Sequence, residues 1–252
     1  MCIRDSVIGV DEAGRGPAIG PLVVASLAVP KEDVQRLIKM GVRDSKRISK
    51  TKRDMIEKDI FETIEERDWK VCVIPISPES IDISRSIKSL NEIEEEAFVE
   101  AIESVSSADT NAKVNLDPIG NNPKLFAMRV YNKLHSRRPN LHFESRKGMD
   151  DKCVVTGAAS IVAKQHRDRV ISDLSDNLGF NLGSGYPSDP ITIEALNQLT
   201  RGDLPHVSLR WTWVTTSNAW KNNHTVPIPI RTTNGTVLQR GLNPIIWKKG
   251  VD

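Results

Sequence analysis

The sequence predicts a mixed α/β fold, in which one sheet is flanked by helices. Short apolar runs, typical of buried strands, come first, and segments with apolar residues at helical spacing then alternate with further short runs. A Gly/Pro loop at 13–17 separates the first two runs, which indicates that they pair as neighbouring strands. With 252 residues, 38% of them hydrophobic, the chain is long enough for one sizeable domain.

The N-terminal half is expected to contain three strands and two helices. Apolar side chains at helical spacing, such as Ile56, Ile60 and Ile64, indicate the helices, and short apolar runs indicate the strands. The strands are expected at 7–10, 21–29 and 71–76, and the helices at 51–66 and 90–105.

The C-terminal half continues the alternation and then loses its pattern. A short strand at 114–117 is stopped by Pro118 and Gly120. Further extended segments are expected at 141–144 and 154–155, and helices at 158–171 and 191–199. From residue 220 onward, five Lys or Arg residues face one acid, so we expect a basic, irregular tail over 216–252.

Composition excludes several classes of protein. The formal net charge of +2 permits a nucleic-acid partner only if basic residues cluster on one face. The three cysteines form no C-x-x-C pair, which argues against a zinc site and for a reducing compartment. No apolar run is long enough to span a membrane, and the start lacks a signal-peptide layout. We therefore expect a cytoplasmic protein.

Acidic residues lie where predicted elements end. Asp11 and Glu12 stand at a strand end before a Gly-rich loop, and Asp117 ends another strand. Neighbouring side chains on a regular strand face opposite ways, so the loop's Gly14 must allow a bend if both acids face one site. Asp168 lies on the helix expected at 158–171. Carboxylates from several elements suit Mg²⁺ or Mn²⁺, although a single acid is more often a solvated charge or a cap.

A series of short motifs runs along the chain. It opens with DEAGRGP at 11–17, continued by IGPLVVA at 19–25. The motifs that follow are RDSK at 43–46, NLD at 115–117, AASIVAK at 158–164 closing on Arg167 and Asp168, GSGYPSDP at 183–190 and RWTW at 210–213. In this order the motifs resemble those of the ribonuclease HII family, and GSGYPSDP is similar to the form found in its archaeal and eukaryotic members.

The resemblance implies a ribonuclease H-like fold, with a mixed five-stranded sheet flanked by helices and a small C-terminal helical region. It implies a catalytic domain at 7–180 and a substrate-clamping region at 181–215, and it leaves the tail at 216–252 without a counterpart. The implied activity is endonucleolytic hydrolysis of the RNA strand of RNA–DNA hybrids. It includes cleavage 5′ to ribonucleotides embedded in duplex DNA, which leaves a 3′-hydroxyl and a 5′-phosphate.

The resemblance also implies roles for individual residues. Two Mg²⁺ or Mn²⁺ ions about 4 Å apart would assist the hydrolysis, and Asp11 is expected to bridge them. The catalytic and metal-binding acids fall on Asp11, Glu12, Asp117 and Asp168. The substrate-binding residues fall on Gly14, Arg15, Gly16 and Tyr186, which would read the ribose 2′-hydroxyl, and on Lys46 and Lys164, which would contact phosphates.

Each of these roles has a plainer alternative. The glycines otherwise mark only a tight turn, Tyr186 is otherwise a half-buried core residue, and the lysines are otherwise solvated. Ser160 is expected to pack or cap rather than act as a nucleophile, and His166 to support the core. The run ESRKGMD at 144–150 is longer than the family's E-H-K-A-D, with Glu144, Lys147 and Asp150 as candidates to keep its roles.

Two partners and two rival functions complete the expectations. The partners are RNA–DNA hybrid or ribonucleotide-containing duplex, and a sliding clamp. The clamp-peptide spacing of Gln239, Leu242 and Ile245 lacks paired aromatics, with only Trp247 near. One rival is ribonuclease HIII, whose extra N-terminal domain has no room before Val7. The other is a scaffold that binds hybrids without cutting them.

Overall fold

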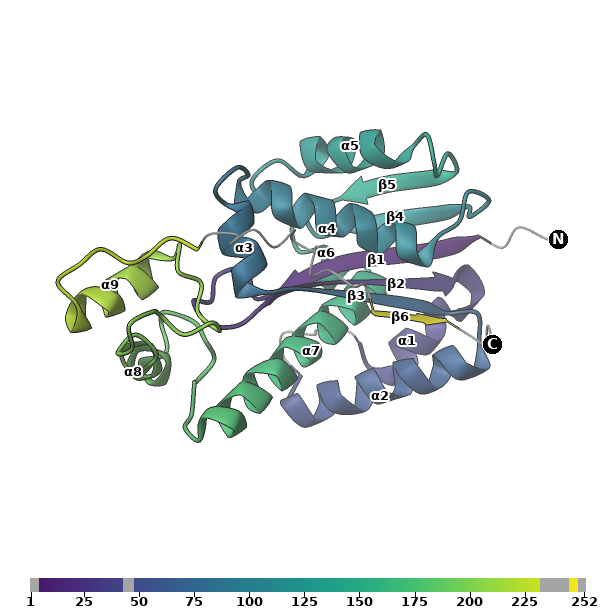
Figure 1. Cartoon of the computed structure of the whole chain (residues 1–252). Helices are drawn as coiled ribbons and strands as arrows, with labels where there is room; N and C mark the ends of the chain where they lie inside the picture. Colours follow the sequence, from purple (N-terminus) through teal and green to yellow (C-terminus); the bar gives the residue numbers. More distant parts are fainter. Residues whose placement is uncertain (1–4, 43–47, 232–244, 249–252) are drawn as a thin grey trace.

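A computed structural model describes residues 5–42, 48–231 and 245–248, which form one mixed sheet covered by helices on both faces (Figure 1). The sheet has the order β5-β4-β1-β2-β3-β6, in which β1, β4 and β5 are parallel and the other pairs antiparallel. The predicted five-stranded mixed sheet is present as β1 to β5. The strands are β1 (Ser6–Ala13), β2 (Leu22–Pro30), β3 (Lys70–Ile76), β4 (Ala112–Leu116), β5 (Leu141–Ser145) and β6 (Ile245–Lys248).

Helices cover each face of the sheet with its own apolar cluster. One face packs against α1 (Val34–Met40), α2 (Lys50–Glu66) and α7 (Val154–Leu178), and the other against α4 (Leu90–Val105) and α5 (Pro123–Leu134). None of the helices in the described part of the chain is long and apolar enough to cross a membrane. The remaining short helices are η1 (Lys31–Asp33), α3 (Pro78–Ser84), α6 (Met149–Lys152), α8 (Pro190–Leu199) and α9 (Val214–Asn223).

The sequence of β2 explains the two-sided burial. Every residue of this strand is buried, with Leu22 and Val24 in the cluster beneath α4 and Val23 and Ala25 in the cluster beneath α7. An uninterrupted apolar run is typical of a strand covered on both faces. The strand therefore fixes the centre of the sheet, next to β1.

Helix α7 corrects one prediction. Val154 and Val155, expected as an extended segment, form its first turn instead. The backbone there lies so close to β1 that a Cβ built on Gly9 would stand 2.3 Å from the Thr156 nitrogen. Tertiary packing thus overrides the strand preference of β-branched residues, and the absent side chain of Gly9 allows the contact.

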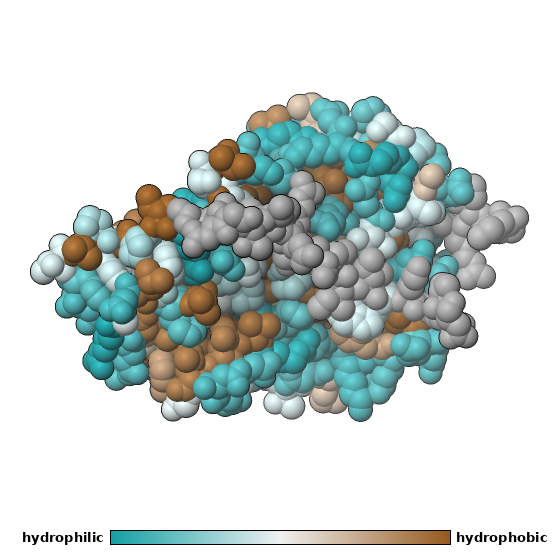
Figure 2. All heavy atoms as spheres, viewed as in Figure 1, coloured by the Kyte–Doolittle hydropathy of each residue, from teal (hydrophilic) through white to brown (hydrophobic). Residues whose placement is uncertain are grey.

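The C-terminal region forms a third apolar cluster, which joins α8, α9 and the end of α7 to Ala18 and Ile19. Figure 2 shows apolar side chains gathered near the C-terminal end of α7. Ile191 and Ile193 of α8 are among the exposed apolar residues. The expected irregular tail is wrong for two segments, because residues up to 223 belong to α9 and residues 245–248 pair with β3 as β6. Lys46, Gln239 and Leu242 lie outside the described residues.

Candidate active site

The carboxyl ends of β1 and β4 bring Asp11 and Asp117 together. These strands are parallel neighbours with Val10 opposite Leu116, so the next residue of each strand reaches the same edge of the sheet. The amide of Asp117 donates to the carbonyl of Val10 over 3.2 Å. Two of the predicted acids are therefore side by side.

Glu12 completes a cluster of three acids with Asp11 and Asp117. Its amide donates to Asp11 Oδ1 over 2.8 Å, and the charge of Asp117 acts on its carboxyl group. Its Oε2 atom is buried and has no hydrogen-bond partner among the described residues. A buried acceptor without a donor is costly, so this atom is suited to a ligand that carries positive charge.

Burial and mutual repulsion shift the titration of the cluster. Burial, followed by the charges of Glu12 and Asp117, raises the pKa of Asp11 well above its usual value, while a hydrogen bond from Ser160 opposes the shift. Burial, followed by the charge of Asp117, raises the pKa of Glu12 to about 7, against the opposing charge of Arg15. Neighbouring carboxyls that resist ionisation together are typical of sites that bind cations.

Asp168 lies on α7, on the helix face that reaches the cluster. Ser160, which contacts Asp11, precedes Lys164 by one turn and Asp168 by two, so Asp168 is about 12 Å further along the helix axis. Its carboxylate lies 3.3 Å from Lys164 Nζ. It also lines a groove with Lys50, Arg167 and Ser184. The predicted site residues Lys164 and Asp168 are therefore paired with each other, and Asp168 lies two helical turns beyond Ser160, the residue that contacts Asp11.

A further acid lies close to Asp117. Asp117 Oδ1 accepts a 2.7 Å hydrogen bond from the amide of Met149, the first residue of α6. The next residue, Asp150, is buried. Asp150 belongs to the segment in which the sequence departs from the family pattern, and α6 carries it to the neighbourhood of the acid cluster.

The acid cluster fits a hard cation by its chemistry. Over residues 5–42, 48–231 and 245–248, no group of three or more His, Cys, Asp or Glu side chains already stands close enough to hold a metal ion. The donors at the cluster are carboxylate oxygens, which Mg²⁺ and Mn²⁺ prefer. The unpartnered Oε2 of Glu12 supplies an observation in favour of such an ion.

The loop after β1 packs closely against two other segments. Gly14 has φ +87°, and a Cβ there would meet the side chain of Arg167 at 2.5 Å. A Cβ on Gly16 would stand 3.4 Å from the ring of Tyr186. Tyr186 is 39% exposed, with the guanidinium of Arg167 5.5 Å from its ring centroid. The loop and Tyr186, predicted together from separate motifs, are neighbours.

The Arg15 side chain has partners within the protein. Its guanidinium forms an ion pair with Glu94 and donates to Asn91 Oδ1 over 2.5 Å, both on α4. Glu94 is fully buried. The predicted substrate ligand is therefore tied to the helix layer, and its charge is shared between Glu94 and the acid cluster.

Several residues that the structure places at the site were given no role in substrate or metal binding by the sequence. Arg167 and Arg210 are buried, and a charged residue in an isolated sequence is assigned to the surface by default. Ser160 carried a usable signal, because Ser160, Lys164 and Asp168 recur every fourth residue and therefore share one helix face.

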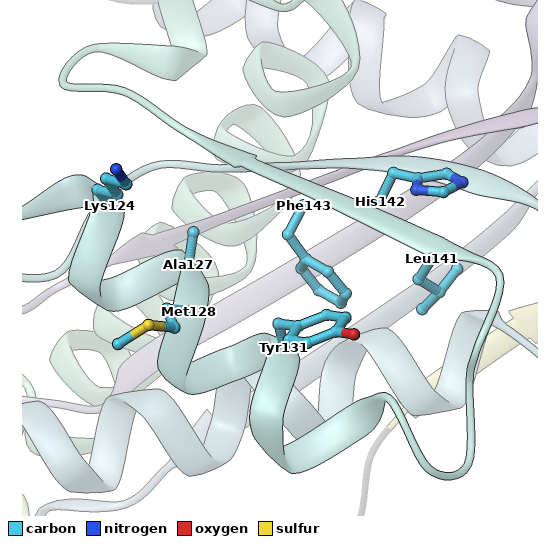
Figure 3. Close-up of a pocket in the computed structure, with 7 residues that line it drawn as sticks. All are labelled: Lys124, Ala127, Met128, Tyr131, Leu141, His142 and Phe143. Atoms are coloured by element: carbon cyan, nitrogen blue, oxygen red, sulfur yellow. The ribbon is translucent and has the colours of Figure 1, made fainter.

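A second concavity lies between α5 and β5, and none of the predicted site residues belongs to its described lining. Tyr131 and Phe143 face one another there with ring centroids 6.0 Å apart (Figure 3). The lining residues are Lys124, Ala127, Met128, Tyr131, Leu141, His142 and Phe143.

Comparison with known proteins gives consistent matches. The family model described as Ribonuclease HII matches residues 8–216. A ribonuclease HII of Methanococcus maripaludis strain C5 is 36% identical over 217 residues, which cover 85% of this chain and 87% of the relative. The ribonuclease H2 structure from Pyrococcus horikoshii OT3 superposes with a TM-score of 0.75 at 34% identity, covering 86% of this chain and 98% of that one. The structure of the PCNA:RNase HII complex from Archaeoglobus fulgidus superposes with a TM-score of 0.72 at 33% identity, covering 85% of this chain and 96% of that one.

Proposed function

The chain belongs to the ribonuclease HII family, and we propose that it cuts duplex DNA on the 5′ side of a single embedded ribonucleotide. As a type 2 ribonuclease H it is a hydrolase that acts on the RNA strand of RNA–DNA hybrids. The proposed cleavage leaves a 3′-hydroxyl and a 5′-phosphate. It proceeds with two divalent metal ions, Mg²⁺ or Mn²⁺.

The observation that carries the proposal is the position of the acid cluster beside the loop of Gly14 and Gly16. Asp11 and Glu12 lead directly into this loop, and Tyr186 packs against Gly16. The 2′-hydroxyl is the group that distinguishes RNA from DNA. Glycines allow the backbone to approach a ribose closely, so a sugar held by the loop and Tyr186 would present its phosphate to the acids.

The acids Asp11, Glu12 and Asp117 are the proposed metal ligands. When bound, two divalent cations would activate the attacking water and stabilise the leaving oxygen. The protein gathers the three carboxylates at one edge of the sheet, where burial and the charge of Asp117 raise the pKa of Glu12 to about 7. Glu12 must therefore give up its remaining proton when it becomes a ligand near neutral pH.

Two acids compete for the fourth ligand position. Asp168 is the predicted residue, but its carboxylate faces Lys164 at 3.3 Å. Asp150 is buried, and it follows directly the residue whose amide holds Asp117. These contacts favour Asp150. Lys164 remains a proposed phosphate ligand, since its Nζ lies 3.3 Å from the carboxylate of Asp168, which lines the groove.

The substrate partner is a duplex that contains ribonucleotides, and a sliding clamp is a proposed second partner. The Archaeoglobus fulgidus relative was solved in complex with PCNA. In this chain, Ile245 of the predicted clamp peptide belongs to β6. A clamp that used Ile245 would therefore compete with the pairing of β6 and β3.

The test uses a labelled DNA duplex with one ribonucleotide and Mg²⁺ or Mn²⁺. The wild-type protein is expected to cut 5′ to the ribonucleotide, and Asp117→Asn to abolish cleavage. Asp150→Asn and Asp168→Asn, compared under the same conditions, assign the fourth ligand to the variant that loses the greater share of activity. A wild-type protein that binds the duplex but leaves it intact with both metals would refute the proposal in favour of a scaffold.

A further inference from the structure

One segment of the C-terminal region holds the loop of residues 14–20 by its carbonyl groups. The side chain of Arg210 donates to three of these carbonyls, and the indole of Trp213 donates to a fourth. The bonds run from Arg210 Nη2 to Gly14 (2.6 Å), Nη1 to Arg15 (3.1 Å) and Nε to Gly20 (3.0 Å), and from Trp213 Nε1 to Gly16 (3.2 Å).

The main chain adds two further bonds to this grip. The amide of Arg210 donates to the carbonyl of Ala18, and the amide of Gly20 donates to the carbonyl of Ser208, both over 2.9 Å. The loop is thus bound along its length to a segment almost two hundred residues away in the sequence.

Arg210 is committed to this contact. Its side chain is fully buried, and its guanidinium lies 4.8 Å from the ring centroid of Trp213. A buried cation is tolerated only when its donors are satisfied, and here backbone carbonyls of the loop accept from Nε, Nη1 and Nη2. The planar fork of arginine suits such a set of acceptors, whereas an ammonium group would not.

The hydrogen bonds to the loop's carbonyl groups also determine the orientation of its amide groups. Because a peptide unit is planar, fixing a carbonyl also fixes the amide of the following residue. With the carbonyls turned toward Arg210 and Trp213, Gly16 lies against Tyr186, with 3.4 Å between a Cβ built there and the tyrosine ring.

We propose that Arg210 and Trp213 are positioning residues for ribose recognition. They hold the loop in the shape in which its backbone and Tyr186 distinguish a ribonucleotide from a deoxyribonucleotide. This inference rests on the proposed function, and it assigns the C-terminal region a part in sugar selection as well as in holding the duplex.

The test compares Trp213→Phe and Arg210→Lys with a matched control, Trp211→Phe. Trp211 lies in the same segment and its Nε1 also donates over 3.2 Å, but to the carbonyl of His206 rather than to the loop. Two quantities are measured for each protein. They are the Kd for an all-DNA duplex without divalent metal, and the single-turnover cleavage rate at saturating protein on the same duplex with one ribonucleotide and Mg²⁺.

We expect Trp213→Phe to cut roughly tenfold more slowly, since one hydrogen bond contributes about this factor, and Arg210→Lys to cut more slowly still. The Kd for the all-DNA duplex should stay within about twofold of the wild-type value in both variants, and Trp211→Phe should match the wild type in both measurements.

Cleavage rates of Trp213→Phe and Arg210→Lys equal to that of Trp211→Phe would overturn the inference. So would a parallel loss of all-DNA binding, because it would mean that the region had merely loosened. A wild-type protein that leaves the ribonucleotide duplex intact would instead refute the proposed function, and the inference with it.

Discussion

Asp11 and Glu12 have raised pKa values, and these make the stability of the protein depend on pH. The pKa of Glu12 rises from its ordinary value of 4.5 to about 7 in the folded protein, and that of Asp11 rises in the same direction. Between these values the unfolded chain releases a proton that the folded protein keeps, so the free energy of unfolding falls as the pH rises. The metal-free protein is therefore expected to lose stability between about pH 4.5 and 7.

Glu12→Gln tests this expectation. The variant removes the buried charge, so without metal at pH 8 its Tm should exceed the wild-type Tm by several degrees, since 1 kcal/mol corresponds to about 2–4 °C. The difference should shrink as the pH falls toward 4.5. Thermal unfolding between pH 4.5 and 8 measures both effects. Glu65→Gln, at an exposed position of α2, is the control and should leave the Tm unchanged. Equal Tm values for Glu12→Gln and wild type at pH 8 would contradict the electrostatic argument.

The sequence could predict those site residues whose positions follow from a local pattern of apolar and polar residues. Asp11 and Asp117 follow apolar runs, and parallel strands bring such ends together. Glu94 and Arg210 could not be found in this way, because each is a buried charge whose partner lies far along the chain. Such pairs become visible only when the fold is known.

At the scale of elements, the contact between α7 and β1 aligns Ser160 with Asp11. Gly9 has no side chain to keep the helix away, and the nearest atoms that a Cβ would meet belong to the backbone of Val155 and Thr156. Backbone atoms cannot turn aside as a flexible side chain can. The position of α7, and with it the row of Ser160, Lys164 and Asp168, therefore depends on this glycine.

Gly9→Ala is expected to destabilise the protein by about 3 kcal/mol or more, because overpacking against backbone forces the helix and strand apart. Denaturation by urea measures the loss. Gly202→Ala is the matched control, since a Cβ there would come no closer than 3.5 Å to another atom, and it should change stability by less than about 0.5 kcal/mol. Similar effects at both positions would show that the α7–β1 contact is not as close as described.

Helix α3 anchors the segment that carries Arg210 and Trp213. Asp82 accepts hydrogen bonds from the amides of Trp211 (2.8 Å) and Thr212 (3.0 Å) and from Arg231 Nε (3.0 Å). The two charged side chains are almost completely buried. This carboxylate thus links the C-terminal region to the helix that follows β3.

Asp82→Ala should cost about 3–5 kcal/mol, because it leaves Arg231 and two amides without their acceptor in a buried place. Thermal unfolding should show a Tm lower by about 6–20 °C. The exposed pair of Lys58 and Glu62, 3.6 Å apart, offers the control. Glu62→Gln should shift the free energy of unfolding by less than about 1 kcal/mol. An Asp82→Ala protein as stable as this control would remove α3 from the anchoring role.

The elements themselves were predictable where their periodicity is long. The helices at 51–66 and 90–105 match α2 and α4 closely, and each begins at a serine whose hydroxyl accepts from a backbone amide. Helix α5 was missed, although Phe126, Val130 and Leu134 are buried at helical spacing, because its solvent face also carries Met128 and Tyr131. β6 has only four residues, and its pairing with β3 depends on a segment distant in the sequence.

At the scale of the whole molecule, two segments of the C-terminal part of the chain pack against the N-terminal part. Residues 208–213 hold the loop after β1, and β6 pairs with β3 at one edge of the sheet. β6 also brings Trp247 against Phe61 of α2, with ring centroids 4.9 Å apart in an edge-on arrangement. Strand β6 therefore belongs to the fold, and a clamp that used Ile245 would have to displace this strand from β3.

Trp247→Ala tests whether β6 stabilises the protein. Loss of a half-buried aromatic side chain should lower the free energy of unfolding by about 2 kcal/mol, measured by urea denaturation, whereas Trp247→Phe should lose less because it keeps a ring against Phe61. Cleavage should be unchanged in both variants, since β2 and β3 separate β6 from β1. A clamp that used Ile245 would have to displace β6 at the same cost. A variant as stable as wild type would mean instead that β6 contributes little to the stability of the fold.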